Sequence, residues 1–102
     1  MYRARDAVEN EDWLAAVDAA ADELDLAEDA RVTARDLFLS SVPDEDRSKP
    51  ATAAASLYAG CLVVGDQRPQ GEIADAMGVS RLSVQKHWKP LLRSAGFEPP
   101  DW

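Results

Sequence analysis

Apolar residues recur at the three- and four-residue spacing of amphipathic helices through most of this 102-residue chain, which predicts an all-α fold. A first helix is expected after Asn10, a residue type that caps helices, and a second over residues 27–41, before Pro43. The expected buried stripes are Trp13, Leu14, Val17, Ala20, Ala21 and Leu24 in the first helix and Ala30, Ala34, Leu37 and Phe38 in the second. The solvent face of the first helix is expected to carry Asp18, Asp22, Glu23 and Asp25.

A third helix, predicted over residues 51–64, is apolar on nearly all sides. A helix of this kind is normally central, with the other helices packed around it. Ser48 is the expected N-cap, and Pro50 lies in the first turn, where its missing N–H costs nothing. Gly60 and the many alanines of this segment allow neighbouring helices to approach closely.

Residues 70–92 predict two short helices joined by a tight turn. Ile73, Ala74 and Met77 form the apolar stripe of the first helix, and Gly78 supplies the left-handed conformation that ends it. Ser80 is the expected N-cap of the second helix.

The second of these helices is expected to bury Val84, Trp88 and Leu91, which are spaced i, i+4, i+7. Pro90 removes a backbone donor there and should kink the helix or end it early. The arrangement is that of a helix-turn-helix, whose second helix can enter a DNA major groove. Two packed helices in an ordinary helical domain would show the same pattern, so both interpretations stay open at this point.

The charge of the chain is unevenly distributed. The net charge is −8, and residues 1–48 hold 14 acidic and 5 basic residues, whereas residues 49–102 hold 5 acidic and 6 basic residues. Within residues 80–93 there are four bases and no acid: Arg81, Lys86, Lys89 and Arg93. An acidic chain is not expected to bind nucleic acid, but this local distribution favours binding through the basic helix. The acid-rich, lysine-poor composition is also typical of a protein from a salt-loving archaeon.

Catalytic and metal-binding chemistry is not expected. The chain has one cysteine, Cys61, inside an apolar segment, and one histidine, His87, in another element, and it has no glycine-rich phosphate loop. We therefore expect no enzyme activity, no metal and no cofactor. Met1 is not followed by an apolar run, and residues 53–64 are too short to span a bilayer. These features predict a soluble, cytoplasmic protein that does not contact membranes.

Three regions are expected along the chain. Residues 1–9 form a flexible N-terminal segment, residues 10–95 the folded domain, and residues 96–102 an extended tail. Phe97 and Trp102 of that tail can fold back over apolar surface.

A family resemblance is carried by short runs between residues 48 and 92: SKP at 48–50, AAA at 53–55, LYA at 57–59, PQGEIA at 69–74, GVS at 78–80, SV at 83–84 and WK at 88–89. These runs resemble the second cyclin-like repeat of archaeal transcription factor B, the relative of the eukaryotic factor TFIIB. The resemblance is close over residues 48–92 and faint over residues 7–42. It implies a five-helix cyclin-like domain ending in a helix-turn-helix that recognises DNA beside the TATA box.

The chain also departs from that family. The family usually has arginine where this chain has Gln85 and His87, tyrosine where it has Trp88, and a helix-continuing residue where it has Pro90. The resemblance implies that the full factor of that family consists of a zinc ribbon, a linker and two repeats. These 102 residues hold one repeat and no CxxC pair, so recruitment of RNA polymerase through a ribbon is not expected of them.

Two hypotheses follow. In the first, the chain is a transcription factor B-like regulator that binds promoter DNA. The side chains facing base edges would be Arg81, Ser83, Gln85 and Lys86, and those facing phosphates Lys89 and Arg93. In the second, it is an adaptor that docks to TATA-binding protein, another regulator or a second copy, through its acidic helices or aromatic tail. A single module buries little DNA surface, so specific binding is expected to need a homodimer or a partner.

Overall fold

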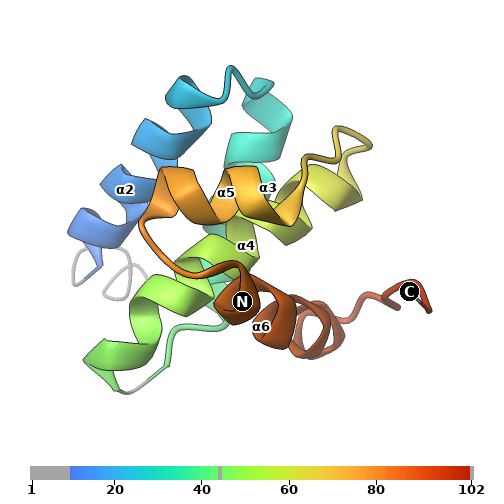
Figure 1. The fold of residues 1–102 in the computed structure, drawn as a ribbon. Coiled ribbons are helices and arrows are strands. Elements are labelled where there is room, and N and C mark those ends of the chain that lie inside the picture. Colours follow the sequence, from blue (N-terminus) through green and yellow to red (C-terminus); the bar gives the residue numbers. More distant parts are fainter. Residues whose placement is uncertain (1–9, 44, 102) are drawn as a thin grey trace.

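The computed structural model describes residues 10–43 and 45–101, and helices account for most of them (Figure 1). Five α-helices and one 3₁₀ turn follow in order: α2 (Glu11–Glu23), α3 (Glu28–Ser40), η1 (Asp46–Ser48), α4 (Lys49–Val63), α5 (Gln70–Met77) and α6 (Arg81–Ser94). The described residues form no strand. The all-α fold expected from the apolar periodicity is therefore confirmed.

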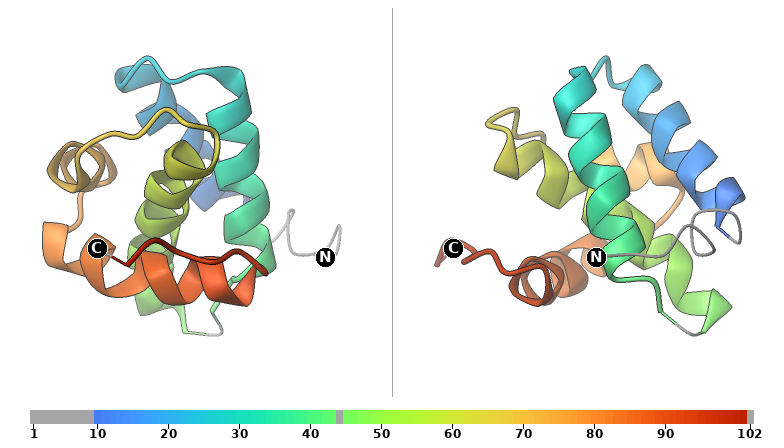
Figure 2. Two further views of the ribbon diagram at one scale, coloured as in Figure 1. Left: turned by 90° about the vertical axis from the view of Figure 1, so that its right-hand side faces the viewer. Right: turned by 180° about the vertical axis from the view of Figure 1, so that it is seen from behind.

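Helix α4 lies at the centre of the bundle, as its apolar sequence predicts. It packs against each of the other four helices, and every residue from 52 to 61 is buried (Figures 1 and 2). Two of its buried hydroxyls are satisfied by carbonyls one turn earlier: Thr52 Oγ1 donates to the Ser48 carbonyl at 2.9 Å and Ser56 Oγ donates to the Thr52 carbonyl at 2.8 Å. These bonds allow Thr52 and Ser56 to lie in the core without an unsatisfied hydroxyl donor.

Helices α3 and α4 approach most closely at Gly60. A Cβ placed on Gly60 would lie 2.9 Å from the backbone nitrogen of Ala34 and 3.1 Å from the carbonyl oxygen of Ala30. A side chain at position 60 would therefore have to push the two helices apart. This is the close approach that the small residues of α4 indicate.

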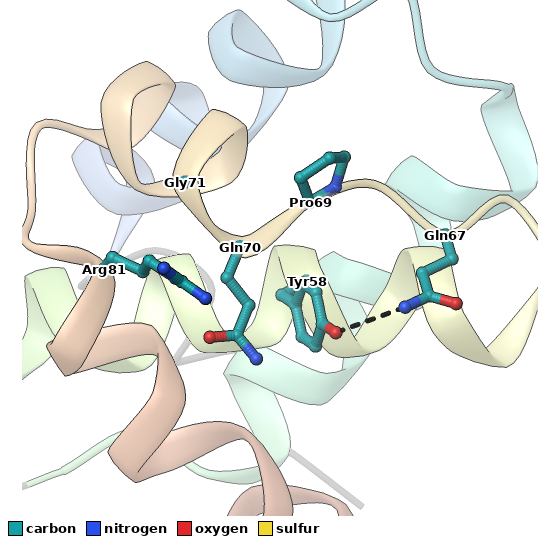
Figure 3. Close-up of a pocket in the computed structure, with 6 residues that line it drawn as sticks. All are labelled: Tyr58, Gln67, Pro69, Gln70, Gly71 and Arg81. Carbon is teal, nitrogen blue, oxygen red and sulfur yellow. Dashed lines mark hydrogen bonds between the residues drawn. The ribbon is translucent and has the colours of Figure 1, made fainter. Parts of the chain in front are cut away.

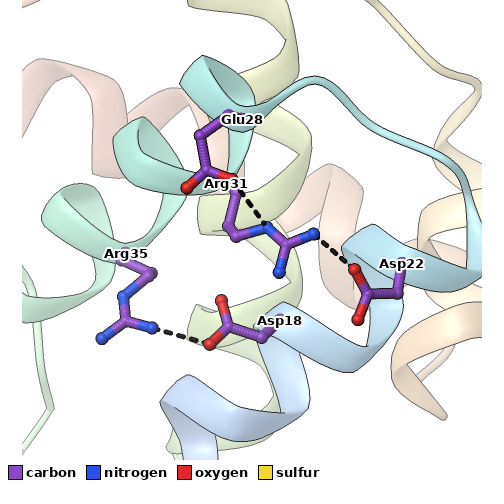
Figure 4. A network of polar contacts seen from close by, with 5 residues as sticks. All are labelled: Asp18, Asp22, Glu28, Arg31 and Arg35. Atoms are coloured by element: carbon purple, nitrogen blue, oxygen red, sulfur yellow. Dashed lines mark hydrogen bonds and ion pairs between the residues drawn. The ribbon is translucent and has the colours of Figure 1, made fainter.

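Ion pairs join α2 to α3 along the edge of the bundle (Figure 4). Arg35 Nη1 lies 2.6 Å from Asp18 Oδ2, and Arg31 pairs with both Asp22 and, at 3.8 Å, Glu28. Two carboxylates of the predicted solvent face of α2 are thus cross-linked to the next helix. The charges are partly exposed, so each pair contributes little stability and mainly fixes how α2 lies on α3.

Three details differ from the expectations. Asn10 precedes α2, but its side chain makes no capping bond, since its backbone (φ −117°, ψ 23°) is not in the extended conformation that brings the side chain to the first N–H groups. Ser48 does not cap α4 because η1 leads directly into that helix and leaves Ser48 in helical geometry. Helix α6 runs four residues past Pro90, so the expected early end is wrong.

The C-terminal region follows α6 without regular structure. The N–H of Phe97 donates to the Leu92 carbonyl at 2.9 Å, and the Phe97 ring, 44% exposed, lines a shallow pocket with Val63 and Leu37. Trp102 and residues 1–9 lie outside the described residues, and the division into three regions stays a prediction. No helix in the described ranges has the length and hydropathy needed to cross a membrane.

Candidate nucleic-acid interface

Helix α5 and the turn after it adopt the geometry that the sequence predicts. Ile73 and Ala74 are buried, and Gly78 ends the helix in the left-handed conformation (φ 70°, ψ 30°). The N–H of Val79 then donates to the Ala74 carbonyl at 3.0 Å. Because glycine takes this conformation without steric cost, the chain can reverse direction within two residues and enter α6.

Ser80 caps α6 through its side chain. Its Oγ accepts a hydrogen bond from the N–H of Ser83 at 3.1 Å and lies 2.9 Å from the Ser83 hydroxyl. The cap satisfies one of the free donors of the first turn and fixes where α6 begins. The predicted cap is confirmed.

The buried side of α6 is anchored on the central helix. Val84, Trp88, Leu91 and Leu92 are all buried. The Trp88 ring packs edge-on against Tyr58 of α4, with ring centroids 5.2 Å apart and an interplanar angle of 70°. These contacts hold the last turn of α6 against α4 beyond Pro90, which is exposed.

The opposite side of α6 carries the basic residues. Arg81, Gln85, Lys86 and Arg93 are exposed, so the structure presents four of the six predicted DNA-binding side chains on open surface. Lys89 is half-buried, and its Nζ lies 5.5 Å from the centroid of the Trp88 ring, within range of a cation–π contact. Arg81 lies in the first turn of the helix, and Arg93 in the last.

Ser83 is placed differently from the other five predicted DNA-binding residues. It is half-buried, and its hydroxyl is directed to the cap residue Ser80. Its carbonyl accepts from His87 Nδ1 at 2.7 Å. In this structure the side chain of Ser83 therefore serves the start of the helix, and its role at base edges stays a prediction.

Sequence reasoning missed Leu82. This side chain is 56% exposed in the first turn of α6, although it is large and apolar. It falls on one side of the helix with Lys86, Lys89 and Arg93, at spacings of four, three and four residues. The signal was present in the sequence: Leu82 is an apolar residue outside the stripe formed by Val84, Trp88 and Leu91.

The single cysteine of the chain lies in the core. Cys61 is fully buried, and burial, followed by the charge of Asp66, raises the pKa of its thiol to about 11. The thiol is therefore protonated at neutral pH and is a poor nucleophile. Among the described residues, no group of three or more His, Cys, Asp or Glu side chains is arranged to hold a metal ion.

A family model described as "Transcription factor TFIIB repeat" matches residues 8–94 of the chain. The match includes every helix from α2 to α6. The chain belongs to the TFIIB repeat family. The match also shows that the relationship extends through α2 and α3, where the sequence alone gives only a faint resemblance.

Archaeal relatives agree with this assignment. The chain is 30% identical over 83 residues to the transcription initiation factor IIB of Pyrococcus abyssi. The matched region covers 78% of this chain and 28% of that protein. It is 33% identical over 52 residues to the transcription initiation factor IIB of Archaeoglobus fulgidus. That matched region covers 51% of this chain and 16% of that protein. The chain thus spans less than a third of the length of the curated relatives it matches. The helical fold is that of a cyclin-like TFIIB repeat.

Proposed function

We propose that this TFIIB repeat contacts promoter DNA through the exposed face of α6. The observation that carries the proposal is the location of charge. In a chain with a net charge of −8, the exposed face of α6 presents Arg81, Lys86 and Arg93, and α6 contains no acidic residue. Such a local patch can attract the phosphate backbone even when the whole protein is acidic.

The proposed chemistry divides along the helix. Arg81, Gln85 and Lys86 lie in the N-terminal half of α6, the part of a recognition helix that reaches base edges in the major groove. Glutamine can bond adenine through two atoms, and lysine can bond guanine or a phosphate. Lys89 and Arg93 lie farther along and are assigned to phosphates, which position the protein without reading sequence.

The double variant Gln85→Ala/Lys86→Ala is expected to lower affinity for a duplex selected from a random-sequence pool by at least about tenfold, because a good base contact contributes ~1–3 kcal/mol. Fluorescence anisotropy over a series of salt concentrations measures this loss. The slope of log affinity against log salt should also fall by about one, because Lys86 no longer displaces a counterion. Arg47→Ala, an exposed arginine on η1, is the matched control and should bind like the parent. Parent-like binding by the double variant would overturn the assignment.

Leu82 is expected to read a thymine methyl group. If it does, replacing one thymine of the selected site with uracil, which lacks only the methyl group, should weaken binding of the parent about fourfold, since burying one such group contributes ~0.8 kcal/mol. The variant Leu82→Ala should bind the thymine and uracil duplexes equally. Sensitivity of Leu82→Ala to the uracil substitution would show that another residue makes the contact.

An adaptor role is the second candidate, favoured by one partly apolar surface at the C-terminal end of α6, beside α3. Val63 and Phe97, 39% and 44% exposed, line the pocket of about 320 Å³ beside Thr33 and Asp36 of α3. A protein partner such as TATA-binding protein, another regulator or a second copy could cover this surface. Amide shifts in an NMR titration separate the two functions: DNA binding predicts shifts at residues 80–89, and docking predicts them in α3 and at Phe97.

A further inference from the structure

His87 is the one histidine of the chain, and it lies on the exposed surface of α6. Its Nδ1 is 2.7 Å from the carbonyl oxygen of Ser83, one turn earlier in the helix. A carbonyl oxygen can only accept a hydrogen bond, so Nδ1 donates to it and keeps its hydrogen whether the ring is neutral or protonated. Nε2 is therefore the nitrogen that gains and loses a proton, and no other hydrogen bond joins this ring to the described residues.

The carbonyl that holds the ring belongs to the capped first turn of α6. Ser83 donates its N–H to the Oγ of Ser80, and the two hydroxyls lie within hydrogen-bond distance of each other. The His87 ring is thus bonded to the backbone of a turn that is already ordered, and its Nε2 has a defined direction before any ligand arrives. A contact made by a group fixed in this way loses less conformational entropy on binding.

The charges near His87 along α6 are basic. Lys86 precedes it, and α6 holds no acidic residue. The helix packs mainly against α4 and α5, in which the charged residues are Lys49, Glu72 and Asp75. No carboxylate in the described part of the chain forms an ion pair with His87. A proton gained by Nε2 therefore adds to the positive charge of α6 and is not neutralised within this part of the chain.

The start of α6 faces α5 on another side of the helix. Figure 3 shows the Arg81 side chain extending toward Gln70, beside a pocket of about 420 Å³ that Tyr58 of α4 also lines. His87 follows Arg81 by six residues, about one and two-thirds turns, so it projects from a different side of α6. His87 does not line this pocket, and its ring is accessible to a ligand outside the bundle.

We propose that His87 contacts a phosphate of the DNA backbone in its protonated form, so that DNA binding by this chain is coupled to the uptake of one proton from solvent. The inference rests on the proposed function for the DNA and on the bond to Ser83 for the ring. Neutral Nε2 carries a lone pair and cannot donate to a phosphate oxygen, whereas protonated Nε2 donates a charge-assisted hydrogen bond to it. Histidine is the side chain whose charge ordinarily changes between pH 5 and 8, so the coupling falls within that range.

DNA affinity is expected to rise as the pH falls. Because the protonated ring binds DNA better than the neutral ring, log affinity should decrease with increasing pH, by at most one per pH unit for one proton. Fluorescence anisotropy with the selected duplex at constant salt should show a loss of about tenfold between about pH 6 and pH 8, the usual weight of one charge-assisted hydrogen bond. Cys61 does not contribute, because burial raises the pKa of its thiol to about 11. A melting curve at each pH checks that the protein is folded.

Two substitutions at this exposed position separate the charge from the side chain. His87→Gln is neutral at every pH and should lose the pH dependence of binding. His87→Arg carries a fixed charge and should bind at the alkaline end of the range about as tightly as the parent binds at the acidic end. Arg47→Gln, on η1, is the matched control and should keep the pH dependence of the parent. Persistence of that dependence in His87→Gln would overturn the proposal.

The tautomer of the ring tests the bond to Ser83. In the free protein, at a pH where the ring is neutral, long-range nitrogen–proton NMR spectra should place the hydrogen on Nδ1. A hydrogen on Nε2 would contradict the geometry from which the contact is inferred.

Modified DNA tests the phosphate. Duplexes that each carry one methylphosphonate, which is neutral, are compared with the unmodified duplex. The pH dependence of the parent should disappear at one backbone position, survive at the others, and be the same for duplexes of different base sequence. Loss of the pH dependence on changing a base pair, with every methylphosphonate position without effect, would overturn the phosphate contact.

Failure of this proposal can be distinguished from failure of the proposed function. No duplex binding by the parent at any pH overturns the proposed function together with the contact. Duplex binding by the parent that does not change with pH overturns the contact of protonated His87 alone and leaves the proposed function standing.

Discussion

Replacing Trp88 with alanine is expected to lower the free energy of unfolding by about 3–5 kcal/mol, the usual cost of removing a large buried aromatic side chain. Trp88 is 2% exposed and is the main aromatic contact between α6 and the central helix, through the ring of Tyr58. A domain of this size has a total stability of roughly 5–15 kcal/mol, so the variant should be close to unfolding at room temperature. Urea denaturation followed by circular dichroism, at the same salt concentration for each protein, measures the change.

Two other variants of α6 serve as comparisons for this loss of stability. Trp88→Phe keeps an aromatic ring against Tyr58 and should lose clearly less stability than the alanine variant. Leu82→Ala removes a large apolar side chain that is 56% exposed, and its unfolding free energy should change by no more than about 0.5 kcal/mol. Equal losses in Trp88→Ala and Leu82→Ala would mean that α6 is not held to α4 by the observed contact.

The features that the sequence predicts correctly depend on neighbouring residues. The αL turn at Gly78 and the side-chain cap at Ser80 are decided within three residues, and both are present in the structure. The central position of α4 follows from its composition alone, since a helix without a polar face has to be covered on all sides. These local rules suffice to place two helices joined by a tight turn at the end of an all-α domain.

The features that the sequence does not predict depend on residues far apart in the chain. Pro90 weakens α6 locally, but Leu91 and Leu92 are buried and keep the last turn helical. The bond from Arg35 to Asp18 joins residues 17 positions apart, and Tyr58 reaches the pocket beside Arg81 from another helix. Only the packed structure brings such groups together, so neither the pocket nor the ion pairs could be inferred from spacing.

The contact between α3 and α4 gives the second large prediction. Gly60→Val is expected to lower the unfolding free energy by about 3 kcal/mol, since its side chain would overlap the backbone of Ala34 and force the helices apart. Gly71→Val is the matched control: a Cβ there meets nothing within 4 Å, and valine has a slightly higher helix propensity than glycine. Its stability in the same urea titration should therefore equal or slightly exceed that of the parent. If the urea concentration at the midpoint of unfolding were the same for both variants and the parent, α3 and α4 would not approach as closely at Gly60 as the structure shows.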